Sequence, residues 1–211
     1  MNFRGLSSFL LIVLTATMVI FTLCACQMQR LSEKTGTTSS EQQTAKKVVR
    51  SDNGEPPGIF QTGQKRTFMA TDDGDLRAGK PWPEPRFIDH GDGTVTDRVN
   101  GLMWTRHADK ANGKVDWEQA ISGAGTCTDG GHDDWRLPNR NELASLIDLG
   151  KYNPALPEGH PFTGVQPSYY WTSTTPANNE DHGWLIHLYI GFVAHDDKAG
   201  THYVWYVRND Q

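Results

Sequence analysis

The sequence predicts an α+β domain in which two helices pack on short, mostly antiparallel strands. Three observations lead to this fold class. Runs of aromatic and β-branched residues alternate with polar turns after Ser168, two capping patterns precede apolar residues at helical spacing, and all seven tryptophans lie between positions 82 and 205. This concentration of tryptophan locates the hydrophobic core in the same part of the chain.

The first predicted element is a β-hairpin between Arg86 and Asp97. Two short apolar runs flank Gly91-Asp-Gly93, and a glycine-rich turn between such runs is a hairpin signal. A third strand is expected to begin at Gly101 and to continue through Trp104.

Two helices are expected in the middle of the domain. Asp116-Trp-Glu-Gln119 is a capping pattern, and the helix that it opens should be stopped by Gly123 and Gly125. Asn139-Arg-Asn-Glu142 repeats the pattern before a helix that should end near Gly150. Its apolar face would consist of Leu143, Leu146 and Ile147.

The C-terminal part is expected to form four further strands. Their aromatic and β-branched runs cover residues 168–174, 183–190, 192–195 and 202–208. Polar turns separate them, among them 177–181 and 196–200. This series completes the sheet on which the helices would pack.

Residues 1–25 have the pattern of a bacterial lipoprotein signal peptide. An uncharged stretch ends at Leu23-Cys-Ala-Cys26, which resembles the lipobox in which the last cysteine is acylated before cleavage. We therefore expect Cys26 to be a lipid-bearing N-terminus, since two or three acyl chains anchor a protein stably in a membrane. Gln27 resembles the residue found in lipoproteins of the outer membrane; a periplasmic and a surface-exposed orientation both remain open. An uncleaved N-terminal helix is the alternative.

The rest of the chain divides into a tether and a domain. Residues 26–57 would be the lipidated cysteine and a disordered spacer, because their polar composition cannot form a core. Residues 58–211 would be the folded domain, and they carry 21 acidic and 14 basic side chains. This charge repels phosphate backbones, which excludes nucleic acid as an expected partner.

Several strings resemble the Lcl C-terminal domain family, which is named after a domain of a collagen-like bacterial adhesin. The most specific is Asp134-Trp-Arg-Leu-Pro-Asn139, and the likeness runs from about Phe68 to Arg208. The resemblance implies a C-type-lectin-like fold, which hosts sugar binders, protein binders and enzymes. The adhesin is associated with sulfated glycosaminoglycans and trimers. This chain has no collagen repeat and an acidic domain, so neither property is carried over, and a homo-oligomer stays open.

Asp89, Asp92 and Asp97 are the candidate metal ligands. With carbonyl oxygens of the hairpin turn they offer the oxygen donors that Ca²⁺ prefers, although the spacing of an EF-hand is absent. The alternative is that Asp and Gly serve only the turn geometry. No other cofactor is predicted, since the eight histidines show no zinc-binding spacing.

The string Asp134-Trp-Arg-Leu-Pro138 is expected to be structural. Trp135 and Leu137 would alternate into the core, and Arg136 would bridge to a carboxylate such as Asp134 or Glu142. Cys127 is expected to be a buried small residue, because it has no cysteine partner in the mature chain.

The aromatic strands after Ser168 are the predicted ligand-binding region. They hold more aromatic side chains than one face can bury if the strands alternate, so some should face solvent or a partner. Together with the polar loop before residue 183 they would suit a sugar or a protein. The candidate binding residues are Tyr170, Trp171, Tyr189, Trp205, Asn179 and Asp181.

These patterns favour a non-enzymatic binding or adhesion module, anchored in the outer membrane and directed at an envelope glycan or protein. One alternative is a metal-dependent enzyme that uses His and Asp residues between Asp181 and His202. A deep pocket ringed by His187, His195 and His202 would favour that reading. The other alternative is a purely structural envelope component.

Overall fold

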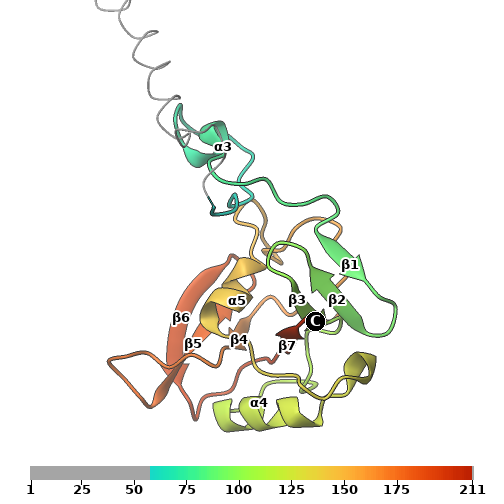
Figure 1. Ribbon diagram of the computed structural model, residues 1–211. Coiled ribbons are helices and arrows are strands. Elements are labelled where there is room, and N and C mark those ends of the chain that lie inside the picture. Colours follow the sequence, from blue (N-terminus) through green and yellow to red (C-terminus); the bar gives the residue numbers. More distant parts are fainter. Residues whose placement is uncertain (1–57, 211) are drawn as a thin grey trace, which may run out of the picture. The chain divides into compact units, whose positions relative to one another are not determined.

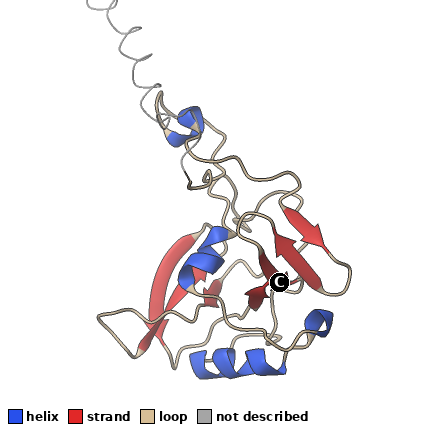
Figure 2. Ribbon diagram, in the orientation of Figure 1, coloured by secondary structure: helices blue, strands red, loops and turns tan. Residues whose placement is uncertain are grey.

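The computed structural model describes residues 58–210 of the 211-residue chain. This part is α+β, as the sequence predicts, with two antiparallel sheets and few helices (Figures 1 and 2). The predicted signal peptide, Cys26 and tether lie outside the described residues. No helix between residues 58 and 210 is long and apolar enough to cross a bilayer.

The first sheet has the strand order β1-β2-β3-β7. Its strands are β1 (Phe87–Asp89), β2 (Thr94–Asp97), β3 (Leu102–Thr105) and β7 (Val207–Asn209). The predicted hairpin is confirmed, with Phe87 opposite Asp97. Because β7 pairs with β3, the last strand of the described chain belongs to the same sheet as the first three strands.

The second sheet has the order β4-β5-β6. It consists of β4 (Tyr169–Trp171), β5 (His182–His187) and β6 (Phe192–Asp197). The predicted strand over 202–208 is shorter than expected, because its first residues form only isolated bridges, such as the one between Tyr203 and Tyr170. The Tyr203 bridge joins this segment to β4 of the second sheet, and the residues after it join the first sheet as β7.

The predicted helices α4 (Trp117–Gly123) and α5 (Arg140–Ser145) are both present, and α5 contacts β5 (Figure 1). Asp116 caps α4, and Asn139 forms a complete capping box with Glu142. Three shorter helical segments were not predicted: α3 (Asp73–Leu76) and the 3₁₀ turns Ala124–Thr126 and Asp129–Gly131.

The predicted end of α5 near Gly150 is wrong. The helix ends at Ser145: the amides of Leu146 and Ile147 form only turn bonds to Leu143 O and Ala144 O, and the next two amides bond to distant segments. The amide of Asp148 donates to Ala155 O over 2.9 Å, and that of Leu149 donates to Thr62 O over 2.9 Å. The apolar face is still buried, with Leu143 and Leu146 fully enclosed.

Two hydrophobic clusters form the core, and the second sheet lies between them. One cluster contains Tyr170, Ile186 and Trp205, together with the buried face of α5. The other contains Trp171, Leu185 and residues around α4. Neighbouring residues of one strand therefore enter different clusters.

A buried ion pair joins the start of the first sheet to its second strand. Arg86 donates to both carboxylate oxygens of Asp97, at 3.1 and 2.7 Å, and also to Ser145 O at 2.6 Å. The two side chains are 5% and 0% exposed. Since such a pair tolerates little displacement, it fixes the hairpin against the end of α5.

Candidate functional site

Exposed apolar side chains gather where the loop after α5 meets the turn between β5 and β6. The backbone joins the two segments, because the amide of Asn153 donates to Tyr189 O over 2.8 Å. The rings of Tyr152 and Tyr189 are in edge contact, with centroids 6.2 Å apart. We call this region the apolar end; it consists of Leu149, Tyr152, Tyr189, Ile190, Phe192 and Val193, each between 38% and 72% exposed, with Phe192 and Val193 on opposite faces of β6.

An apolar cavity of about 460 Å³ lies beside the apolar end. Ala144 and Ile147 form its floor, and Leu149 and Gly191 connect it to the exposed surface. Its other wall comes from residues far away in sequence: Ile59, Phe60, Gln61, Thr62, Trp82 and Val99. The cavity has the size of a small-ligand pocket or of a receptor for a large apolar side chain.

Three of the predicted binding residues are core residues. Tyr170, Trp171 and Trp205 are each 0% exposed, so the prediction that they face a ligand is wrong. Their polar atoms are satisfied internally: Trp171 Nε1 donates to Val115 O over 2.8 Å and Trp205 Nε1 donates to Thr105 O over 2.7 Å. Burial raises the pKa of the Tyr170 hydroxyl, which accepts a hydrogen bond from the Gln166 amide.

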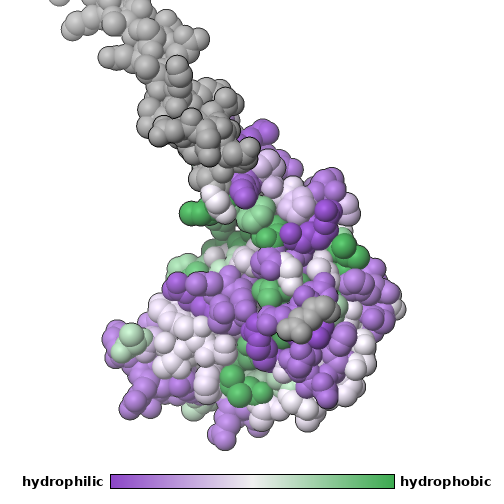
Figure 3. All heavy atoms as spheres, in the orientation of Figure 1, coloured by the Kyte–Doolittle hydropathy of each residue, from purple (hydrophilic) through white to green (hydrophobic). Residues whose placement is uncertain are grey.

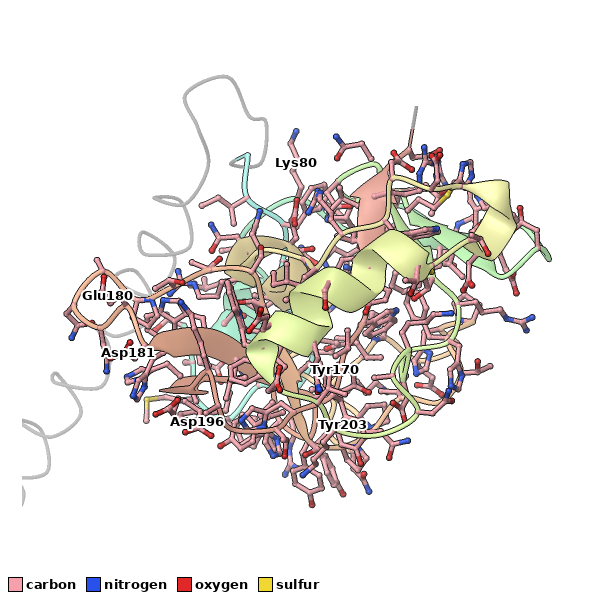
Figure 4. The ribbon with its side chains drawn as sticks, turned by 90° about the horizontal axis from the view of Figure 1, so that it is seen from below. Lys80, Tyr170, Glu180, Asp181, Asp196 and Tyr203 are labelled. Atoms are coloured by element: carbon pink, nitrogen blue, oxygen red, sulfur yellow. The ribbon has the colours of Figure 1, made fainter. Side chains whose placement is uncertain are left out.

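The other three predicted binding residues are accessible but do not form one site. Tyr189 belongs to the apolar end, after the last residue of β5. Asn179 and Asp181 lie before the first residue of β5, at its opposite end. Six strand residues at about 3.3 Å each place the two groups roughly 20 Å apart. Figure 4 shows Asp181 on a projecting loop, away from Tyr170.

A shallow polar hollow lies near that loop. It is lined by Arg140, Asn141, Thr174, Thr175 and Trp184, among others, and has a volume of about 430 Å³. The Arg140 guanidinium lies over the Trp184 ring, with its central carbon 5.1 Å from the ring centroid. The same ring is in edge contact with His195. The sequence reasoning did not single out Trp184, because nothing in its strand distinguishes it from its buried neighbours.

The three candidate calcium ligands have separate roles. Asp97 is enclosed with Arg86, Asp92 accepts from the hydroxyl of Thr94 at 2.6 Å, and Asp89 lies 3.3 Å from Arg106 Nε. Within residues 58–210, no three His, Cys, Asp or Glu side chains form a group that could hold a metal ion. Each aspartate also accepts from the backbone amide two residues further on, that of Gly91, Thr94 or Val99, which agrees with a role in turn geometry; calcium binding stays a prediction.

The histidines near β6 form pairs. His182 Nδ1 and His195 Nδ1 are 2.9 Å apart, and His202 Nε2 is 2.9 Å from Asp196 Oδ2. Burial lowers the pKa of His202, and the contact with Asp196 opposes this shift only in part. Neither the apolar cavity nor the polar hollow has His187, His195 or His202 in its wall.

The Asp134-Trp-Arg-Leu-Pro138 string has the structural role that was predicted. Trp135 and Leu137 are buried, and Arg136 makes two bonds of 2.7 Å to the Glu142 carboxylate. Burial would raise the pKa of Glu142, but the bonds from Arg136 and from the Asn139 amide outweigh it and lower the pKa. Cys127 is buried, which raises the pKa of its thiol and fits the predicted packing role.

Comparison with known proteins gives one family. The family model of the Lcl C-terminal domain matches residues 93–208, more than half of the chain. The comparison with curated proteins gives no match. Residues 58–92, which supply most of the distant wall of the apolar cavity, precede the matched region.

Proposed function

This chain belongs to the Lcl C-terminal domain family, and from that premise we propose that it is a non-enzymatic binding module at the bacterial outer membrane. Its ligand is a protein with an apolar segment that docks on the apolar end. The observation that carries the proposal is the exposed cluster around the β5–β6 turn, directly beside the apolar cavity.

The composition of the apolar end favours a protein ligand over a glycan. Contiguous apolar patches are uncommon on soluble monomers and often mark interaction sites, and aromatic residues are enriched at protein interfaces. Figure 3 shows a mostly hydrophilic face with separate apolar areas. A large apolar side chain of the partner would fill the cavity and serve as the anchor of the interface.

The membrane anchor rests on the sequence. The lipobox-like Leu23-Cys-Ala-Cys26 supports acylation of Cys26, and the polar residues after it support a tether that holds the domain near the membrane. Mass spectrometry of the mature N-terminus tests this step independently. An unmodified Cys26 would rule the anchor out and leave the binding proposal standing.

We propose a C-type-lectin-like fold for the domain. The succession of hairpin, two helices and a second sheet supports this assignment, as does the pairing of the first sheet with the last strand. The fold allows binding but does not specify the ligand.

Site-specific photocrosslinking tests the protein ligand. A photoreactive phenylalanine analogue at Phe192 should give a discrete adduct in living cells, whereas the same analogue at the exposed Asp133 should not. Ile190→Ser should abolish the adduct at Phe192 without lowering Tm, because Ile190 is 53% exposed. An adduct of twice the chain's mass would identify a second copy as the partner. Equal labelling at both positions would contradict the proposal.

A glycan is the second candidate ligand, and the polar hollow beside Trp184 favours it. Guanidinium, amide and hydroxyl groups surround an indole there, which is a suitable set for sugar hydroxyls. A glycan array probed with the chain and with Trp184→Ala tests this candidate. Binding that survives the substitution would exclude the hollow as the glycan site.

A further inference from the structure

A second, polar cavity lies on the other side of Trp82 from the apolar cavity. Its volume is about 290 Å³, and Trp82 lines both spaces. Segments 82–87 and 157–161 form most of the walls, with four prolines that make them stiff. Arg86 and Asp148 are the two buried ionisable residues in this lining, at 6% and 4% exposure.

Arg86 has an unused donor group inside the protein. Its Nε and Nη2 bind Asp97 and Ser145 O, and the rings of Trp82 and Phe87 lie 4.6 and 4.8 Å from the guanidinium carbon. Nη1 is buried and has no hydrogen-bond partner within the described residues. Buried donors without a partner are rare because an unsatisfied buried group destabilises the fold, so a ligand that accepts from Nη1 removes this cost.

Asp148 supplies the complementary acceptor. One carboxyl oxygen accepts from the Gly150 amide at 2.8 Å, and the other takes part in no hydrogen bond among residues 58–210. Burial raises the pKa of this carboxyl, against the opposing effects of the Gly150 amide and of the charges on Lys151, Lys65 and Arg86. The lining of the cavity therefore contains both the free N–H donor of Arg86 and a carboxyl oxygen of Asp148 that can accept a hydrogen bond.

The charge of the cavity selects a neutral ligand. An anionic ligand would meet the Asp148 carboxylate, while the Arg86 charge is already balanced by Asp97 and the other cations of the lining, Lys65 and Lys151, are exposed side chains. An ammonium group would meet the guanidinium. A hydroxyl accepts from Nη1 and donates to Asp148 at the same time, which satisfies both groups.

We infer that this polar cavity is a binding site for one neutral, hydroxyl-rich ring of monosaccharide size, held between Arg86 and Asp148. At about 290 Å³ the volume lies just below the usual range for small-molecule pockets, which fits one such ring. Trp82, Phe87 and the prolines contact its apolar edges. The site is distinct from the protein-docking surface proposed above, although Trp82 lines both cavities.

Isothermal titration of the full chain in detergent with four matched probes tests the inference. Methyl α-D-glucoside and N-acetylglucosamine are neutral, glucosamine is cationic and glucuronate is anionic. The neutral sugars should bind with a Kd on the order of 1 mM, typical of a single ring with few contacts, and both charged sugars should bind at least tenfold more weakly. Tighter binding of glucuronate, or no saturation with any probe, would overturn the inference.

Three variants locate the binding. Asp148→Asn keeps the size of the side chain and the acceptor for Gly150 but replaces the free acceptor by a donor, so affinity should fall at least tenfold. Asp133→Asn, an exposed carboxylate outside the cavity, should bind like the unaltered chain. Trp184→Ala, in the polar hollow, tells the two candidate sugar sites apart. Binding that is lost in Trp184→Ala and kept in Asp148→Asn would assign the sugar to the polar hollow and refute the inference.

A fourth variant covers the case in which Asp148→Asn disturbs folding. Glu158 lines the cavity mouth and its side chain is 82% exposed, so Glu158→Trp should fold normally and obstruct entry. Neutral sugars should then bind more weakly at an unchanged Tm. Unaltered affinity in this variant would count against the site.

Discussion

Removing the negative charge of Asp97 should leave Arg86 buried without its counter-ion. The Asp97 side chain is 0% exposed and accepts from Arg86 Nε, Arg86 Nη2 and the Val99 amide. Asp97→Asn should therefore cost about 3–5 kcal/mol of unfolding free energy, which for a domain of this size lowers Tm by about 6–20 °C. Tryptophan fluorescence during urea unfolding measures the loss.

A double variant separates the ion pair from general damage to the core. Arg86→Met with Asp97→Asn removes the uncompensated charge, so the double variant should lose about 2 kcal/mol less than the sum of the two single variants. Asp133→Asn is the surface control and should change stability by less than about 0.5 kcal/mol. A loss below about 1 kcal/mol for Asp97→Asn, or strict additivity in the double variant, would show that the buried ion pair does not stabilise the domain.

Three other outcomes are expected. Glu142→Gln should lower the free energy of unfolding by about 1–2 kcal/mol in urea, because it weakens both the bond to Arg136 and the capping box. Glu118→Gln, in the first turn of α4, is the control and should leave this free energy nearly unchanged. Burial lowers the pKa of His202 from 6.5, so the unfolded chain binds a proton at this residue more readily than the folded chain does. The free energy of unfolding should therefore fall as the pH drops below about 6.5. His202→Gln should reduce this dependence between pH 6.5 and 5, as urea titrations at several pH values will show. Iodoacetamide should label Cys127 only after unfolding, as peptide mass spectrometry will show; rapid labelling of the native chain would contradict its burial.

Local patterns predicted the secondary structure well. The caps at Asp116 and Asn139 depend on residues three positions away, so the sequence contains all the information that a helix start needs. The hairpin before Asp97 is similarly local. The end of α5 could not be read in this way, because Thr62 and Ala155 compete for the backbone that would have continued it.

The aromatic side chains show where pattern reasoning fails. Strand alternation assumes one buried face, and on that assumption Tyr170 and Trp171 cannot both be in the core. Both are, because each face of the second sheet is covered by its own hydrophobic cluster. Local patterns cannot predict the two cavities either, because Trp82 meets Gly191 in one and Asp148 in the other only through tertiary packing.

The pairing of β3 with β7 has a consequence for how the domain forms in the cell. Trp205 and Thr105 share a hydrogen bond across 100 residues of sequence, and Met103 lies opposite Arg208. The first sheet is therefore incomplete until nearly the whole domain has emerged from the ribosome, and contacts of such long range slow folding. An exported chain would have time to pass through a translocation channel unfolded before its last strand could close the sheet.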